Sequence, residues 1–526
     1  MSNEVLNEQW ELPENPWPPT LAVMLATFIF VLDSTIANVA LPHMAGSFSA
    51  TTDEAMWILT SYIISSGIIL PSVGWFSGVF GRKKFFITCV LIFTFSSLLC
   101  GLANSLDEMI LARILQGLGG GAIIPIAQAI LLESFPVEQR RRSMAIFGFG
   151  VILAPIIGPL LGGWITDNYS WQWIFYINVP LGILAAILSN MFLEDPPYAR
   201  KKENPKIDYV GFSFLIIWLV TLQVVLDKGQ NADWFNAPWV CWTSAVSVIS
   251  MIAFIWSQLK ERESLIDLSV FKNRNFAWGT GLLVIVTGIL YASLVIMPIF
   301  LQNLIGYTAF LSGYAIMPRG IGSITAIIIT GAFAQKVDDR VLILIGLIFM
   351  GIANFLFGQC NLEISIYNII FPNMLFGMGM GFTMISISSL SASTLKNNQM
   401  TNATGIQNLF KNIGGAIGTS IVATLLSRFA QAHQYNMVGH LNPLNPVFAY
   451  KLQAVTHALA KYTALPIAQH KASYFLYGSL LEQANLCAFI DSFRLFGVIS
   501  FAVIPVVLFF KSTKKAKQTD DISMMH

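Results

Sequence analysis

Long uninterrupted apolar segments are the feature that most restricts the fold of this chain. Hydropathy separates about fourteen runs of roughly 20 residues, each long enough for a helix to cross a hydrocarbon core of about 30 Å. Only 11% of the 526 residues are charged, whereas about 25% is usual in soluble domains. Mean hydropathy is +0.65. The sequence therefore predicts an all-α membrane protein with 14 transmembrane helices.

The distribution of basic residues predicts the orientation in the membrane. Most of the 30 Lys and Arg residues fall in the loops on the side that also carries both chain ends, so the positive-inside rule places both termini in the cytoplasm. Residues 1–19 contain four Glu and no Lys or Arg, and the apolar run that follows is too long for a signal peptide. We expect the first helix to be retained.

Glycine motifs indicate that the chain is duplicated. Gly117, Gly119 and Gly121 recur as Gly377, Gly379 and Gly381, the pair Gly158 and Gly162 recurs as Gly414 and Gly418, and Gly74 recurs as Gly331, all at a spacing of about 256–260 residues. This order predicts two six-helix bundles with two helices inserted between them. The predicted parts are a cytoplasmic N-terminal segment (1–19), the first bundle (20–193), a linker with the two extra helices (194–275), the second bundle (276–511) with a long outer loop (427–487), and a cytoplasmic tail (512–526).

The outer loop 427–487 holds four of the six histidines, His433, His440, His457 and His470. Their spacing is unlike that of metal ligands, so we expect solvated histidines and no metal site. A loop of this length is more often a docking surface than a passive connection. Just after the loop, Asp491 and Arg494 lie three residues apart on a helix and are expected to pair.

Two opposite charges are predicted to lie at the same depth in the membrane. Asp33 lies about 20 Å from the cytoplasmic start of the first apolar run, and Arg113 lies roughly 9 Å below the outer start of the fourth. Either charge alone is costly in hydrocarbon, so pairing or a water-filled cavity is expected. A carboxylate that gains and loses a proton there suits a reversible proton carrier. A purely structural ion pair is the alternative.

A second motif is the stretch "GFGVILAPIIGPLLGG" from Gly148 to Gly163. Small residues at every fourth position let helix backbones approach closely, and the prolines remove backbone donors and bend the helix. The stretch predicts a tight, kinked seam between helices, although ordinary glycine-mediated packing has a similar pattern.

Several strings together resemble one transporter family. "LDSTIANVALP", "GWFSGVFGRKK", "LARILQGLGGG", "APIIGPLLGG" and "WQWIFYINVPLG" are similar to the major facilitator superfamily, in its fourteen-helix drug:proton antiporter branch. "LQVVLDKGQNADWF", "LIDLSVFKNRNF" and "AIGTSI" look like EmrB-type multidrug exporters. The resemblance implies a multi-pass exporter in the bacterial inner membrane that alternates access between two bundles and exchanges protons for hydrophobic or amphipathic compounds.

The resemblance also assigns roles and partners. It makes the proton the coupling ion, with no other cofactor, and it implies a periplasmic adaptor protein and an outer-membrane channel as partners. Two departures are Gly78, where the gate loop usually has an acid, and Gln172, where a basic residue is common. The implied roles are proton coupling for Asp33 and Arg113, an antiporter motif of Gly150, Pro155, Gly158, Pro159, Gly162 and Gly163, and a gate loop with Gly74, Gly81 and Arg82.

A cavity for bulky apolar compounds should be lined by aromatic, Met and amide side chains. The candidates are Asn38, Tyr62, Gln116, Gln128, Tyr291, Phe376, Met384 and Gln407, although each suits plain helix packing equally well. Glu133, Arg319 and Lys411 are further buried charges whose roles stay open between cavity, gate and structural pairing.

Other functions remain as alternatives. The glycine and proline seam and the scarcity of polar residues in the spans argue against a proton-coupled importer of a small metabolite. A receptor that kept the fold but lost transport is a further alternative, which substrate-dependent proton flux would exclude. An enzyme is not expected, because the apolar runs contain no histidine and no nucleophile–base constellation. The sequence also lacks a GxxxxGK[ST] phosphate loop, which argues against transport driven by ATP on this chain.

Overall fold

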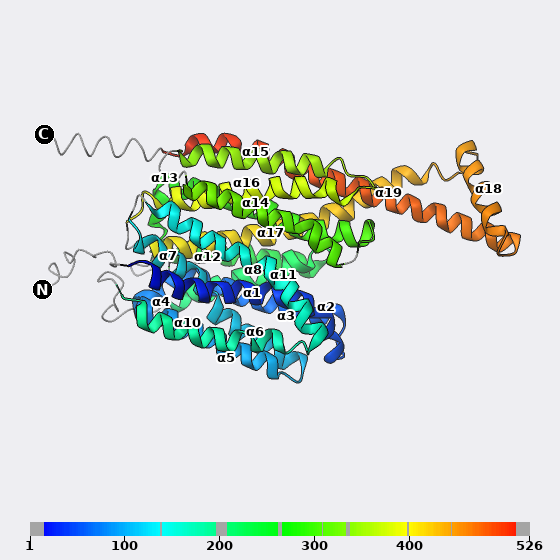
Figure 1. Ribbon diagram of the computed structural model, residues 1–526. Helices are drawn as coiled ribbons and strands as arrows, with labels where there is room; N and C mark the ends of the chain where they lie inside the picture. Colours follow the sequence, from blue (N-terminus) through cyan, green and yellow to red (C-terminus); the bar gives the residue numbers. More distant parts are fainter. Residues whose placement is uncertain are drawn as a thin grey trace, which may run out of the picture.

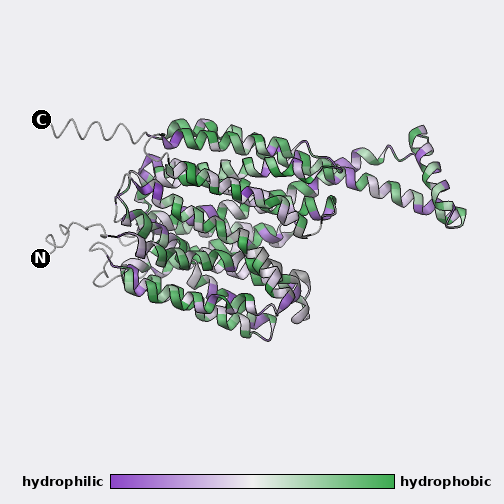
Figure 2. Ribbon diagram, in the orientation of Figure 1, coloured by the Kyte–Doolittle hydropathy of each residue, from purple (hydrophilic) through white to green (hydrophobic). Residues whose placement is uncertain are grey.

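The computed structural model describes residues 15–136, 139–195, 208–260, 266–307, 309–332, 337–396, 399–442 and 444–511. Over these residues the chain is helical with short connections and no strand, as the sequence predicts. Thirteen helical stretches are long and apolar enough to cross a membrane, and α8, with 29 residues, is long enough to be the fourteenth. Hydrophobic residues predominate along the bundle (Figure 2).

The first half of the chain forms six crossings, three of which are interrupted. The second, fourth and sixth are each built from two helices, separated by a short 3-10 turn, a turn at Gly121 and a turn at Ile177. The helices of this half are α1 (Trp17–Ser47), α2 (Thr52–Ala55), α3 (Trp57–Ile69), α4 (Val73–Phe80), α5 (Arg82–Leu102), α6 (Leu106–Gly120), α7 (Ile123–Ser134), α8 (Arg140–Asn168), α9 (Trp173–Tyr176) and α10 (Asn178–Phe192).

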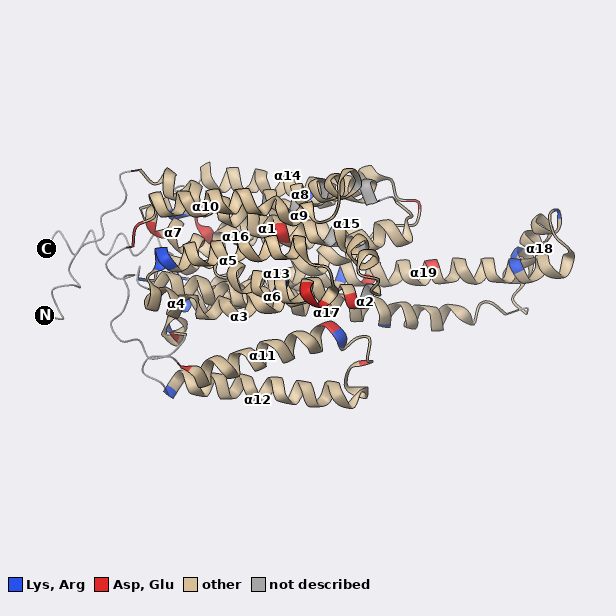
Figure 3. Cartoon of the chain, turned by 90° about the horizontal axis from the view of Figure 1, so that it is seen from below, with Lys and Arg blue, Asp and Glu red and all other residues tan. Residues whose placement is uncertain are grey.

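The second half repeats this arrangement with longer helices. They are α13 (Arg274–Ile299), α14 (Ala309–Ala332), α15 (Asp339–Phe357), α16 (Ile366–Ala392), α17 (Met400–Val438), α18 (Pro446–Ala460) and α19 (Leu465–Ala502). Between the halves, α11 (Tyr209–Lys228) and α12 (Pro238–Lys260) pack on each other and lie as a pair beside the bundle (Figure 3).

The start of α1 and the last described helical turns (Ile504–Phe509) lie at one end of the bundle, here called the terminal end, and a helical extension projects from the opposite end (Figure 1). The extension consists of the last part of α17, α18 and the first part of α19. The predicted outer loop 427–487 is therefore mostly helical. The chain turns sharply before α18, where Asn445 is the N-cap residue. The Asn445 side chain accepts the backbone N–H of Val447 at 3.0 Å, and Pro446 occupies the first helical position.

At the base of the extension, the partner of Asp491 differs from the predicted one. His433 Nε2 of α17 lies 2.8 Å from Asp491 Oδ2 of α19, and Arg494 Nε donates to the carbonyl oxygen of Gly358 at 3.2 Å. Asp491 therefore faces the neighbouring helix instead of Arg494, because the packing of α17 against α19 brings a closer partner than its own helix does.

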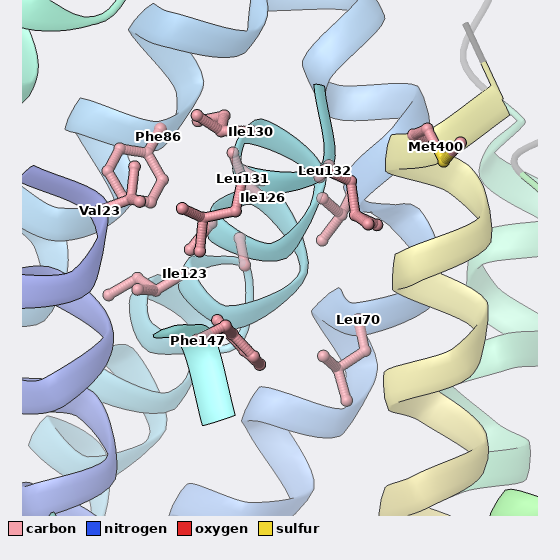
Figure 4. Close-up of a cluster of buried hydrophobic side chains, with 14 of the residues drawn as sticks. Val23, Leu70, Phe86, Ile123, Ile126, Ile130, Leu131, Leu132, Phe147 and Met400 are labelled. Atoms are coloured by element: carbon pink, nitrogen blue, oxygen red, sulfur yellow. The ribbon is translucent and has the colours of Figure 1, made fainter. Parts of the chain in front are cut away.

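The two halves share a hydrophobic core at the terminal end. One cluster of buried side chains includes Leu132 and Phe147 from the first half and Met400 and Ile406 from the second; Figure 4 shows Leu132 of α7 beside Met400 of α17. The cluster at the other end of the first half, around Ile36 and Phe175, contains only residues of that half. The large cluster of the second half, which includes Phe300 and Phe493, contains only its own residues. The halves are thus closed against each other at the terminal end.

Candidate functional site

A buried polar cluster in the first half is centred on Asp33. Asp33 lies in the middle of α1, and its Oδ2 accepts a hydrogen bond from Arg113 Nη1 of α6 at 2.6 Å. Its Oδ1 accepts from Gln116 Nε2 at 3.0 Å and from Asn178 Nδ2 at 2.8 Å. Three helices, α1, α6 and α10, therefore deliver the carboxylate and all three of its donors. Charge-assisted hydrogen bonds of this kind fix the position of the carboxylate.

The guanidinium of Arg113 is oriented by its own set of contacts. Nη1 also donates to Gln116 Oε1 at 2.7 Å, and Nε donates to the carbonyl oxygen of Ile58 at 3.2 Å. The guanidinium carbon lies 4.2 Å from the ring centre of Tyr62, within the range of a cation–π interaction. Nη2 has no hydrogen-bond partner among the described atoms. Asp33 is the carboxylate that balances its charge.

Neither charge of this pair reaches solvent. The side chains of Asp33 and Arg113 are both 0% exposed. The predicted meeting of the two charges is thus present, and it is a direct ion pair instead of a water-filled cavity. Because the carboxylate is sealed in this conformation, a proton can reach it only when the surrounding helices move apart.

Two members of the cluster were not predicted as partners of Asp33. Gln116 is predicted from the sequence to line the substrate cavity, and Asn178 lies within the string "WQWIFYINVPLG", which contributes to the family resemblance. Asn178 Nδ2 also contacts Ser97 Oγ at 3.1 Å, which links α10 to α5. The signal available in the sequence was polarity at a depth near that of Asp33, but amides are common enough in helices that depth alone does not select them.

The glycine seam lies directly beside Asp33. A Cβ atom at Gly158 of α8 would overlap Thr35 Oγ1, and one at Gly162 would lie 2.8 Å from Ile36 Cγ1. Thr35 and Ile36 belong to the turn of α1 that follows Asp33. The seam therefore presses α8 onto the helix that carries the acid. A Cβ at Gly150 would overlap the Met24 side chain, whereas one at Gly163 meets nothing within 4 Å; Pro155 and Pro159 lie within α8, and their side chains are outside the described set.

The acid that pairs with Arg82 of the gate loop comes from another helix. Arg82 Nη1 lies 2.5 Å from Glu133 Oε2, and both side chains are at most 4% exposed. Glu133 of α7 thus supplies the carboxylate that is missing at Gly78. Gly81 adopts a φ of 83°, which favours glycine, and the backbone N–H of Lys83 donates to Asp195 Oδ1 at 2.7 Å.

Polar contacts between the halves also cluster at the terminal end. Thr404 Oγ1 donates to the carbonyl oxygen of Pro125 at 2.9 Å, and Asn408 Nδ2 donates to Gln128 Oε1 at 3.1 Å. A Cβ at Gly74 of the gate loop would lie 3.0 Å from Asn402 Cα. These contacts join α7 and α4 to α17 and close the same end as the shared hydrophobic core.

The predicted cavity residues are spread over several environments. Tyr62 and Gln116 belong to the Asp33 cluster, and Gln128 to the contact between the halves. Gln407 is buried, Met384 is half-buried and packs on the core of the second half, Tyr291 is exposed, and Phe376 lies under Arg319. The side chain of Asn38 lies outside the described residues. A role for these side chains in substrate binding stays a prediction, as does the role of Asp33 and Arg113 in proton coupling.

Comparison with known proteins agrees with this architecture. Residues 23–419 match the model of the Major Facilitator Superfamily. The chain is 36% identical to the probable multidrug resistance protein EmrY of Escherichia coli over 82% of this chain and 84% of that protein. It is 34% identical to the multidrug export protein EmrB of Haemophilus influenzae over 81% of this chain and 84% of that protein. The crystal structure of the human organic anion transporter MFSD10 has a similar fold, with a TM-score of 0.60, 13% identity, and coverage of 94% of this chain and 100% of that one.

Proposed function

The chain belongs to the major facilitator superfamily and is a transporter rather than an enzyme, and from this premise we propose that it exports hydrophobic or amphipathic drugs in exchange for protons. The proposal agrees with the printed names of its relatives, which are multidrug resistance and export proteins. The observation that carries it is the fully buried Asp33 carboxylate beside Arg113. An ionisable group held inside a membrane bundle is a functional candidate by default.

The closed terminal end defines one conformation of an alternating-access cycle. In this conformation Asp33 is sealed and bound to Arg113, Gln116 and Asn178. Protonation of Asp33 removes its charge and weakens its bond to Arg113, so the two states of the carboxyl group favour different arrangements of α1, α6 and α10. A membrane potential adds about 2.3 kcal/mol per transferred charge per 100 mV as a driving force.

Proteoliposomes with an internal pH-sensitive dye test this proposal. Addition of dodecyltrimethylammonium, a cationic amphiphile, should move protons through the wild-type protein, and Asp33→Asn should abolish this movement while the protein stays folded. Asp227→Asn is the matched control, because it also removes a carboxylate from a spanning helix. Full proton movement by the Asp33→Asn variant would refute the assignment.

We further propose that the terminal end faces the cytoplasm in the bacterial inner membrane. The basic loops of the sequence support this orientation. The helical extension then projects into the periplasm, where it is our candidate contact for an adaptor protein that connects to an outer-membrane channel. It carries several exposed tyrosines: Tyr435, Tyr450, Tyr462 and Tyr474. Aromatic side chains are enriched at protein interfaces.

Deletion of residues 440–463, the tip of the extension, tests this contact. Cross-linking to a co-expressed adaptor should be lost, while uptake of drug from the medium into inverted inner-membrane vesicles, which need no outer-membrane channel, should persist. Unchanged cross-linking would place the contact elsewhere on the molecule.

A further inference from the structure

A second buried cation lies in the other half of the molecule, at Arg319 of α14. Its Nη2 donates to Ser293 Oγ of α13 at 3.0 Å and to Asn373 Oδ1 of α16 at 2.9 Å, and its Nε donates to the same Oδ1 at 3.2 Å. The guanidinium carbon lies 4.5 Å from the ring centre of Phe376. Arg319 is 4% exposed. Its remaining nitrogen, Nη1, is buried and has no hydrogen-bond partner among the described atoms.

Among the described residues, no carboxylate forms an ion pair with Arg319. The sequence contains no Asp or Glu between Asp267 and Asp338, and none between Glu363 and Glu482. The helices α13, α14 and α16 therefore carry no acid at all, and nor does the part of α17 within the bundle. An arginine keeps its charge in any protein environment, and burial of an isolated charge is unfavourable. The negative charge that balances Arg319 must therefore come from outside these helices.

The position of Arg319 corresponds to that of the Asp33 cluster through the internal repeat. Ser293 is the repeat equivalent of Asp33, and Asn373 is that of Arg113, because each lies about 260 residues further along the chain, the spacing that relates the glycine motifs of the two halves. The close helix contacts also correspond. A Cβ at Gly117 of α6 would overlap the Ser65 side chain and press on the Tyr62 carbonyl of α3. A Cβ at Gly377 of α16, the repeat equivalent of Gly117, would overlap the Arg319 carbonyl of α14.

The two clusters differ in which helix carries the arginine and in whether an acid faces it. In the first half, the acid is on the first helix and the arginine on the fourth, stacked on Tyr62 of the second. In the second half, the arginine is on the second helix, stacked on Phe376 of the fourth, and Ser293 replaces the acid. The second cluster thus keeps the cation and its aromatic support but has lost the internal anion.

The geometry points to an anion-binding site at Arg319, Asn373 and Ser293 that receives the charged head group of an amphipathic acid, such as a carboxylate. Nη1 of Arg319 offers an unused donor, and a planar guanidinium matches a carboxylate well. The helices α14 and α16 both pack on α8 of the first half, so movement between the halves can uncover the guanidinium. This inference rests on the proposed export function and specifies one substrate class for it.

Binding of two probes with the same tail and opposite charge tests the inference. The wild-type protein in nanodiscs of zwitterionic lipid is mixed at pH 8 with radiolabelled dodecanoate or dodecyltrimethylammonium. We expect Arg319→Gln to weaken dodecanoate binding about tenfold or more and to leave dodecyltrimethylammonium binding within about twofold. Arg428→Gln, which removes an exposed cation from the same half, is the matched control and should bind both probes like the wild type.

A second variant keeps the test decisive if Arg319→Gln does not fold. Asn373→Asp places a carboxylate 2.9 Å from Arg319 with little change in shape, so it should satisfy the cation internally, raise the apparent melting temperature and remove dodecanoate binding. Unchanged dodecanoate binding by either variant, or equal loss of both probes, would overturn the inference.

Two further arms identify the source of the anion and separate this inference from the export function. Competition of dodecanoate with phosphatidylglycerol in the nanodisc would assign the site to a lipid head group and overturn the substrate assignment. Binding is measured without a proton gradient. Arg319-dependent dodecanoate binding therefore supports the inference even if the proteoliposomes show no proton exchange, which would refute only the proposed export function.

Discussion

Asp33 Oδ2 and Arg113 Nη1 lie 2.6 Å apart on α1 and α6, and neither side chain has any exposed surface. This ion pair joins the first and fourth crossings of the first half. Its charges compensate each other only while those helices keep their present arrangement. The pair therefore connects the charge state of one carboxyl group to the packing of a bundle.

Removal of either partner of this pair should destabilise the protein more than removal of both. Breaking a buried ion pair costs about 3–5 kcal/mol, because it leaves an uncompensated charge. We expect Arg113→Gln to lower the apparent melting temperature of the purified protein at neutral pH, and the double variant Asp33→Asn with Arg113→Gln to recover part of the loss. Additive losses would show that the two side chains are not coupled.

Replacement of Asn178 should lower the stability of the bundle. Asn178→Leu removes one of the three donors to Asp33, and loss of a hydrogen bond to a buried charged group costs about 1–3 kcal/mol. The apparent melting temperature of the purified protein should therefore fall.

Ser97→Ala is the control for that loss, because it removes the other partner of Asn178 and leaves Asp33 with all its donors. Its melting temperature should stay closer to that of the wild type. A melting temperature for Asn178→Leu equal to the wild-type value would mean that the hydrogen bond from Asn178 to Asp33 does not stabilise the protein.

Substitution of glycine by alanine in the seam should impair transport at Gly158 and have little effect at Gly163. Gly158→Ala places a methyl group on Thr35 Oγ1, beside Asp33, and overpacking of this kind costs about 1–3 kcal/mol. Gly163→Ala meets nothing within 4 Å. We expect loss of resistance to toxic amphiphiles, or a proton leak in proteoliposomes, from Gly158→Ala and nearly wild-type behaviour from Gly163→Ala. Equal behaviour of the two variants would contradict the seam.

A disulfide should trap the closed terminal end. A Cβ at Gly331 of α14 would lie 3.6 Å from the Cβ of Ala145 of α8, within the separation that disulfides require. Oxidation of the double variant Ala145→Cys with Gly331→Cys should form a cross-link between the halves and stop transport, and a reducing agent should restore it. The single cysteine variants provide the controls. Full transport by the cross-linked protein would show that this end does not open during the cycle.

Some of these relationships followed from the sequence and others did not. The depth of Asp33 and Arg113 could be counted along their helices, because an α-helix rises 1.5 Å per residue. The partner of Arg82 could not be identified by such counting. Glu133 lies on a different helix, and the sequence offered only a missing acid at Gly78. The pairing of Asp491 was wrong for a related reason, since the nearest charge along its own helix is farther from it than His433 on the neighbouring helix.

The sequence by itself determined the membrane class of the protein, its family, its helical crossings, its internal repeat and the depth of its buried charges. Hydropathy, spacing and rise per residue are properties of a single helix, so they can be read along the chain. Only the tertiary structure decided that Gln116 and Asn178 bind Asp33, that Glu133 binds Arg82, that residues 427–487 extend two helices, and that Arg319 meets Ser293 and Asn373. These contacts depend on how each helix is rotated about its axis and on which helices are neighbours, and the packing of the whole bundle sets both.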